Sequence, residues 1–238
     1  MKYIIIFLLV LSLSASAIVY FAWQDFNSPN DLTQEVTVVL PSSSGFIKSI
    51  DILAENKIIK YPLPVKIIGY ITGYAFYAKA GEYNFPASIS PKAVLQILMQ
   101  GKVVKYKITF AEGLNVREIS EILLADKVLE GDVPANIEEG SLFPETYQFV
   151  RGDTRTAIIT RMQDKMQQTL DELWEKRADN LPLADKQQAL ILASIVEKET
   201  GLATERARVA AVFINRLKKG MRLQSDPTVI YGIEKTTG

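Results

Sequence analysis

The sequence contains neither cysteine nor histidine among its 238 residues. Without these residue types the chain cannot build a Ser-His-Asp triad, a Cys-His dyad or a zinc site with the usual ligands. Acid–base chemistry must therefore use Asp, Glu, Lys or Tyr, and one or two carboxyl groups suit cleavage of a glycosidic bond best. The lack of cysteine also fits an oxidising compartment without a disulfide framework.

An excess of either charge is also absent, because Lys+Arg and Asp+Glu number 27 each. This balance provides no basic field that would attract a polyanion, so we expect no nucleic-acid partner. Hydrophobic residues make up 48% of the chain, which fits a globular body with one very apolar segment. The length accommodates one large domain, or two modest domains together with an anchor.

The very apolar segment is residues 3–23, which carry no charge. About 20 such residues are enough to cross a bilayer. Lys2 precedes the segment and Asp25 follows it, so we expect a transmembrane anchor over residues 3–24 with the body on the non-cytoplasmic side. The alternative is a cleaved signal peptide, because Ala-Ser-Ala at residues 15–17 resembles a cleavage site, although the apolar run continues past that point.

Strand and helix patterns alternate after a polar linker over residues 25–35. We expect strands at residues 36–40 and 103–110, a turn and strand at residues 80–85, and helices that begin at about Phe46, Val65, Ser90 and Asn115, the third of them closed by Gly101. A long amphipathic helix over residues 155–177 follows. This mixture predicts an α+β fold, with a small α+β module over residues 36–112 and a mainly helical α+β domain over residues 113–238.

A helix capped by Asp185 carries an apolar stripe that ends in a carboxyl group. Glu199 continues the i, i+3, i+4, i+7 pattern of Leu192, Ile195 and Val196, whereas Glu197 falls off it. A carboxyl group held against apolar neighbours prefers its protonated form and can act as a general acid. The alternative is that the helix simply ends here and Glu199 extends into water.

A second amphipathic helix and a polar loop follow Glu199. The helix covers residues 204–217 and ends before Gly220, which is typical of a C-terminal cap. The loop, residues 221–232, is dense in hydrogen-bonding side chains and is broken by Asp226-Pro227. A sugar-binding cleft needs such a loop beside its carboxyl group.

Four segments in this region together resemble the signature of the endolytic murein transglycosylases, the YceG-like family. They are ASIVEKET at residues 193–200, ER at 205–206, VFINRL at 212–217 and GMRLQSDPTVIYG at 220–232. In that family the second glutamate of the EKE triplet is catalytic, and it corresponds to Glu199. The apolar stripe selects the same residue independently.

Two shorter segments extend the resemblance. EGSLFPETY at residues 139–147 is similar to the family's EGxLFPDTY motif, with Glu145 in place of aspartate, and we expect it to form a loop around the catalytic region. AGEYNF at residues 80–85 matches the AGxY pattern of the family's lysin-motif-like module. The resemblance therefore implies a lysin-motif-like module over residues 36–112, and a fold alone leaves open whether that module binds glycan.

The resemblance implies a single-pass protein of the bacterial inner membrane whose body acts outside the cytoplasm on peptidoglycan glycan strands. Protonated Glu199 would donate to the oxygen between N-acetylmuramic acid and N-acetylglucosamine, and its carboxylate would then accept the proton of the muramic acid 6-hydroxyl, so that a 1,6-anhydro ring closes. Neither metal nor cofactor is needed, and cell-wall synthesis proteins are a further class of partner. Candidates for substrate contacts are Glu205, Arg206, Asn215, Arg222, Gln224, Asp226, Thr228 and Tyr231.

Two alternatives stay open at the level of the sequence. A hydrolytic muramidase would use Glu199 with a second carboxylate such as Asp226, and a wall-binding or divisome-associated scaffold would use neither. The chain stops at Gly238, shortly after the DPTVIYG motif, whereas the family continues with a further segment. We therefore expect the domain over residues 113–238 to be incomplete.

Overall fold

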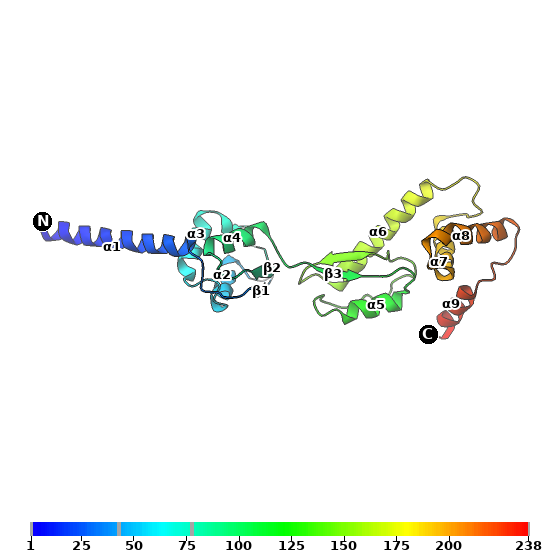
Figure 1. Ribbon diagram of the computed structural model, residues 1–238, viewed down its shortest axis with the longest axis horizontal. Helices are drawn as coiled ribbons and strands as arrows, with labels where there is room; N and C mark the ends of the chain where they lie inside the picture. Colours follow the sequence, from blue (N-terminus) through cyan, green and yellow to red (C-terminus); the bar gives the residue numbers. More distant parts are fainter. Residues whose placement is uncertain (1, 42–43, 77–78, 238) are drawn as a thin grey trace. The chain divides into compact units, whose positions relative to one another are not determined.

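A computed structural model describes residues 2–41, 44–76 and 79–237, and it has the predicted α+β character with an N-terminal apolar helix (Figure 1). The chain divides into two compact units. The first comprises the residues up to Tyr106 together with Val150–Gly152, and the second comprises Lys107–Phe149 and the residues from Asp153 onward.

The first unit holds a two-stranded sheet among short helices. Its elements in chain order are α1 (Lys2–Asn27), β1 (Val36–Leu40), α2 (Phe46–Glu55), α3 (Pro62–Ile71), the 3-10 turn η1 (Tyr74–Phe76), β2 (Gly81–Phe85) and α4 (Pro91–Gln100). The strands are antiparallel, with Val38 opposite Tyr83. The Ser90 side chain caps α4, and Gly101 ends it with a positive φ of 60°. The predicted boundaries of this helix are therefore confirmed.

The helix α3 differs from its predicted span, which ran from Val65 to Tyr77. It begins three residues earlier, because a proline in the first turn needs no amide partner and has a helical φ in advance. It ends at Ile71, since Gly73 adopts a left-handed φ of 79° that breaks the helix before η1. Tyr77 lies outside the described residues.

The first unit has one large core, and the last turn of α1 is part of it. Phe26 is buried there with side chains of both strands and of α2, α3 and α4. The backbone N–H of Asn30 donates to the Ile89 carbonyl at 2.9 Å. Its side-chain amide donates to the Ile58 carbonyl, also at 2.9 Å. Residues in the predicted linker are therefore held against the module by specific hydrogen bonds.

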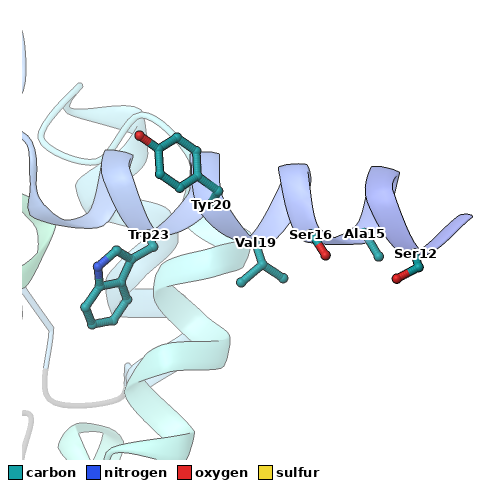
Figure 2. Close-up of a pocket in the computed structure, with 6 residues that line it drawn as sticks. All are labelled: Ser12, Ala15, Ser16, Val19, Tyr20 and Trp23. Atoms are coloured by element: carbon teal, nitrogen blue, oxygen red, sulfur yellow. The ribbon is translucent and has the colours of Figure 1, made fainter. Parts of the chain in front are cut away.

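By length and composition α1 fits a membrane span or a signal sequence. Its 26 residues include a window of mean hydropathy 2.6, no part of which is buried. A shallow hollow along α1 is lined by Ser12, Ala15, Ser16, Val19, Tyr20 and Trp23. Figure 2 shows these side chains, with the small ones toward the N-terminal part of the helix and Tyr20 and Trp23 near its C-terminal end. Aromatic residues near the end of an apolar helix are typical of a membrane interface.

A buried carboxylate also stabilises the first unit. Glu82 of β2 accepts hydrogen bonds from the Tyr106 hydroxyl and from Arg151 Nε, each at 2.7 Å and each to its Oε2 atom. The Glu82 side chain is 11% exposed. Tyr106 and Arg151 belong to the segments by which the chain leaves this unit and returns to it.

The second unit begins with a two-stranded sheet, β3 (Tyr106–Thr109, whose first residue belongs to the first unit) and β4 (Thr146–Phe149), and two helices, α5 (Val116–Ala125) and α6 (Arg155–Glu175). The strand predicted over residues 103–110 is regular only in its second half, because Val103 forms a bridge with Tyr83 instead. Asn115 and Glu118 form a capping box at the start of α5, as the sequence favours. The inward side chains of α6 are Ile158, Ile159 and Met162.

Three further helices complete the second unit: α7 (Lys186–Glu199), α8 (Ala203–Lys218) and α9 (Asp226–Thr237). The last of these was not predicted, since the sequence suggested a loop and a short apolar run. The Asp-Pro pair that indicated a break instead begins the helix, because proline is favoured in a first helical turn. Both α8 and α9 contact α7, and these contacts build the candidate site.

Candidate active site

Helix α7 carries the two glutamates of the EKE triplet, and its ordered start comes from a cap. The Asp185 side chain accepts a hydrogen bond from the Gln188 amide at 2.8 Å, as predicted. Leu192, Ile195 and Val196 are buried against Phe213 of α8. The apolar stripe is therefore confirmed as far as Val196.

The expectation that Glu199 lies among apolar neighbours is wrong, because the structure leaves this residue exposed. Glu199 is the last residue of α7, and Thr200 leaves the helix with extended backbone angles of −147° and 125°. Its side chain therefore extends beyond the part of the stripe that α8 covers. The helical period indicates which residues share a face but not how far another element covers that face.

The Glu199 carboxyl group has a specific protein partner all the same. The Ser225 hydroxyl donates to Glu199 Oε1 at 2.5 Å, a short hydrogen bond of the kind that charged acceptors form. Ser225 is itself buried, with 4% of its surface exposed. Across the described residues, no other side chain donates to this carboxyl group, so Glu199 Oε2 stays available to a ligand.

Ser225 is held in place from both sides. Upstream, Arg216 of α8 donates from Nη1 to the Leu223 carbonyl and, at 3.3 Å, to Gln224 Oε1. Gln224 adopts a left-handed φ of 52°, a conformation that non-glycine residues rarely adopt without support. Downstream, the Thr228 hydroxyl donates to the Ser225 carbonyl at 2.6 Å. These bonds fix the backbone on either side of Ser225, and the Ser225 hydroxyl joins this loop to the C-terminal end of α7.

Glu197 lies on a different side of α7 and is ion-paired. Arg206 Nη2 lies 2.9 Å from each of its carboxylate oxygens. The Glu197 side chain is only 26% exposed, so its position off the apolar stripe does not make it a free surface residue. In the part of the chain that the structure describes, Arg206 Nε is buried without a hydrogen-bond partner. Arg206, a predicted substrate contact, is thus occupied by Glu197.

The loop before α5 also reaches this end of α7, which the sequence did not indicate. A Cβ atom at Gly113 would lie 3.7 Å from Glu197 Cγ and 3.7 Å from Lys198 Cε. Gly113 has a φ of 77°, which glycine adopts without strain. The only sequence signal here was the glycine itself, since the periodic patterns end at Phe110.

The remaining candidates differ in what they contact. Glu205 accepts a hydrogen bond from the Thr200 hydroxyl at 3.2 Å, so it fixes the turn between α7 and α8. Gln224 and Thr228 position Ser225, as described above. The other four are exposed, and within the described ranges none of them forms a hydrogen bond with Glu199; they are Asn215, Arg222, Asp226 and Tyr231.

The sequence reasoning passed over Ser225, although it selected Gln224 and Asp226 on either side of it. The residue stands inside the quoted GMRLQSDPTVIYG segment, so the motif was a usable signal. A serine hydroxyl is too common in loops to be chosen by type alone. Only the folded chain brings it next to a carboxyl group 26 residues away.

The EGSLFPETY segment lies elsewhere on α7. Gly140 approaches α7 closely, because a Cβ atom there would lie 3.0 Å from Leu190 Cδ2. Glu139 accepts hydrogen bonds from the Val116 amide at the start of α5. A polar hollow lies beside this loop, lined by Glu138, Glu139, Gly140, Ser141, Gln163, Asp164, Met166, Gln167, Leu170, Gln187 and Leu190. The loop therefore covers the first half of α7 rather than the end that bears Glu199.

Acidic side chains in the described ranges form no group of three or more that could hold a metal ion. The chemistry available at the end of α7 is that of one exposed carboxyl group, one hydroxyl donor and an adjacent ion pair. A carboxyl group with one oxygen fixed and the other open can donate a proton and later accept one.

Comparison with known proteins identifies relatives with a related sequence. The model of the YceG-like family matches residues 38–238. A protein of Bacillus subtilis named endolytic murein transglycosylase is 28% identical, over 86% of this chain and 65% of the relative. A protein of the same name from Streptococcus pneumoniae is 28% identical, over 96% of this chain and 49% of the relative.

The chain thus spans about two thirds of the length of the Bacillus relative and about half of the length of the Streptococcus relative. Among solved structures, a YceG-like protein from Listeria monocytogenes is similar, with 24% identity and a TM-score of 0.43. That match covers 84% of this chain and 76% of the Listeria chain.

Proposed function

The chain belongs to the YceG-like family, since the match covers residues 38–238, and from this premise we propose that it is a lytic transglycosylase of peptidoglycan. The resemblance that the motifs predicted is thereby confirmed. The proposed reaction cleaves glycan strands internally, between N-acetylmuramic acid and N-acetylglucosamine, and leaves 1,6-anhydro ends. Its proposed role is to terminate or trim nascent strands.

In this proposal Glu199 is both the acid and the base. Its Oε2 proton passes to the bridging oxygen as the bond to muramic acid C1 breaks, and N-acetylglucosamine leaves as an alcohol. The muramic acid 6-hydroxyl oxygen then bonds to C1 and returns its proton to Glu199. The nucleophile belongs to the substrate and no water is consumed, so one carboxyl group is enough where a typical glycosidase needs two.

The hydrogen bond from Ser225 to Glu199 is the observation that supports this assignment best. The hydroxyl donates to Oε1 whether the carboxyl group is neutral or ionised, so that Oε2 can hold or lose the proton in both steps. Because Glu199 is exposed in the free chain, the proposal requires the bound glycan to displace water from it. Exclusion of water by a substrate strengthens the electrostatic interactions within a site.

The membrane anchor is also part of the proposal. Helix α1 would hold the chain in the bacterial cytoplasmic membrane, with the remainder outside the cytoplasm where peptidoglycan lies, and cell-wall synthesis proteins would be partners there. The domain boundaries predicted from the sequence, with a lysin-motif-like module over residues 36–112 and a catalytic domain from residue 113, stay a prediction. Recovery of the uncleaved chain from carbonate-washed membranes would support the anchor, whereas a soluble chain starting near Ile18 would indicate a signal peptide.

One observation supports a hydrolytic alternative. Asp226 is exposed and directly follows the serine that binds Glu199, so a second carboxylate stands one residue from the Ser225–Glu199 contact. A muramidase would leave reducing ends, whereas a transglycosylase leaves anhydro ends. Mass spectrometry of the products therefore separates the two reactions.

The test is Glu199→Gln in the complete gene product, supplied with purified glycan strands. Loss of the only acid–base group should lower the rate of anhydro-end formation by about 10²–10⁴-fold. Glu175→Gln, a nearly isosteric change at an exposed position of α6, is the matched control and should retain the parental rate. The catalytic acid was assigned wrongly if Glu199→Gln still forms anhydro ends at the parental rate while Glu197→Gln loses that activity. A parent chain that binds glycan without cleaving it would favour the scaffold.

A further inference from the structure

The outward side of helix α3 is apolar, which is unusual for a helix in contact with water. Leu63, Ile67, Tyr70 and Ile71 are all exposed, and their spacing of i, i+4, i+7 and i+8 places them on one side of the helix. The opposite side is buried through Val65, which is 1% exposed. A surface helix normally exposes a polar side to water. The side of α3 that is exposed to water is apolar instead. Large exposed apolar patches mark protein or membrane contacts.

Helix α1 indicates which partner lies beside this surface. It continues without a break to Asn27, and Phe26 is buried in the core of the first unit. The twenty residues Ile4–Trp23 would span about 30 Å, which is the thickness of the hydrocarbon layer. Gln24, Asp25 and Phe26 add only about 4.5 Å at 1.5 Å per residue. The headgroup layer on each side is about 5–7 Å thick, so the core of the first unit begins within it.

Helix α3 lies at the end of the unit that faces this boundary. Both α3 and α4 contact α1, and Figure 1 shows α3 beside the point where α1 joins the first unit. The rings of Trp23 and Phe26 are 6.2 Å apart. Figure 2 shows Trp23 extending from that same end of α1. A membrane around α1 would therefore be the apolar environment nearest to α3.

The charges near α3 suit a lipid surface as well. Lys57 and Lys60 are exposed shortly before the helix, and the Lys60 ammonium lies 5.7 Å from the centre of the Tyr61 ring. The carboxylate of Asp51 is paired with Lys66, and the exposed Asp31 carboxylate lies 3.9 Å from the Lys60 ammonium. Exposed lysines attract anionic headgroups, at about 1 kcal/mol for each residue near the surface. Tyrosine rings favour the boundary between headgroups and acyl chains.

We propose that the apolar side of α3 docks on the bilayer that α1 crosses, with Leu63, Ile67 and Ile71 at the boundary between headgroups and acyl chains. The first unit would then be attached at two points, the spanning helix and this surface helix, and it would rest on the membrane without a flexible linker. This inference depends on the anchor in the proposed function. It does not depend on the chemistry of Glu199.

The absence of cysteine from the chain allows a direct test. Single variants Ile67→Cys and Ile71→Cys, labelled with a fluorophore, are reconstituted as the full chain in vesicles of anionic and zwitterionic phospholipid that carry a nitroxide quencher on the upper acyl chain. Thr37→Cys, an exposed position of β1, is the matched control. We expect loss of most of the label fluorescence at residues 67 and 71, and little loss at residue 37.

The outcomes separate this proposal from the anchor. An integral chain whose three labels are quenched equally weakly would overturn the membrane surface at α3 and leave the anchor intact. A processed, soluble chain would remove the anchor. If its labels at residues 67 and 71 were still quenched on addition of vesicles, the lipid-binding surface would stand without α1, and if they were not, both proposals would fail.

Discussion

At the residue scale, the candidate chemistry depends on one hydrogen bond between Ser225 and Glu199. We predict that Ser225→Ala lowers kcat for anhydro-end formation by about 10- to 100-fold, because a hydrogen bond to a charged group contributes about 1.5–3 kcal/mol. KM should change little, since the hydroxyl orients the carboxyl group rather than contacting the glycan. Steady-state kinetics over a range of glycan concentrations give both constants.

Two variants show whether positioning is the reason for that loss. Ser225→Thr keeps a hydroxyl and should restore much of the rate, with thermal unfolding as the check that the added methyl group is tolerated. Ser194→Ala removes a hydroxyl that bonds only within α7 and should have no effect. A Ser225→Ala enzyme as fast as its parent would rule out a positioning role, while Glu199 could still be the acid.

The Glu197–Arg206 pair leads to a different prediction from the one that the sequence suggests. A surface glutamate off the apolar stripe would tolerate Gln with a change of about 0.5 kcal/mol or less. Because this pair is partly buried and Arg206 Nε already lacks a partner, the loss of the Glu197 charge leaves the guanidinium poorly paired. We therefore expect Glu197→Gln to lower the free energy of unfolding by about 1 kcal/mol. Urea denaturation measures the change, and a shift no larger than that of Glu175→Gln would contradict it.

At the scale of elements, the close approach of α2 and α3 determines which side of α3 is buried. A Cβ atom at Gly69 would lie 2.2 Å from Phe46 Cζ, and the Phe46 ring also packs edge-on against Tyr70. We predict that Gly69→Ala lowers the free energy of unfolding of the first unit by about 1–3 kcal/mol, because the ring must move within a packed core.

The control is Gly45→Ala, where a new Cβ atom meets nothing within 4 Å; because Gly45 is the N-cap of α2 and alanine caps less well than glycine, the expected change is a loss of up to about 1 kcal/mol. Thermal unfolding of the two variants provides the comparison. Equal stability of Gly69→Ala and the parent would mean that α2 and α3 do not pack as closely as described. The packing of α3 on α2 would then no longer explain why the apolar side of α3 is exposed.

At the scale of the whole molecule, Glu82 links β2 to both segments by which the chain passes between its two units. Burial acts to raise the pKa of Glu82, but the hydrogen bonds from Tyr106 and Arg151 and the charge of Arg151 outweigh it, so the pKa lies below its usual value of 4.5. The unfolded chain therefore binds this proton more readily than the folded chain. The contribution to stability is present above about pH 4.5 and is lost as the pH falls through the folded pKa.

We therefore predict that Glu82→Gln lowers the free energy of unfolding by about 2 kcal/mol at pH 7, the value typical of hydrogen bonds to a charged group. The loss should become smaller as the pH falls from 4.5 through the folded pKa, because the parent then loses the stabilisation that the ionised Glu82 provides. Urea denaturation between pH 3 and pH 7 measures both effects. If the difference in free energy of unfolding between parent and variant stayed constant over this range, the charge of Glu82 would not be the source of the stabilisation.

Much of the local structure could be predicted, since its determinants are close together in the sequence. Ser90 and Gly101 delimit α4, Asp185 begins α7, and the short strand expected at residues 36–40 is β1. The start of α9 was missed because Asp-Pro is compatible with either a turn or a first helical turn. Length and composition likewise indicated a membrane-spanning helix or a signal sequence, and the geometry of α1 alone does not separate them.

The sequence by itself determined the family, the candidate acid Glu199 and the residues that share each helical side, because motifs and periodicity are properties of neighbouring residues. Only the tertiary structure decided which of those sides is covered. It left Glu199 and the apolar side of α3 exposed, and it paired Glu197 with Arg206 and Glu199 with Ser225. These outcomes depend on packing between elements and on contacts between residues far apart in the chain, neither of which a helical period contains.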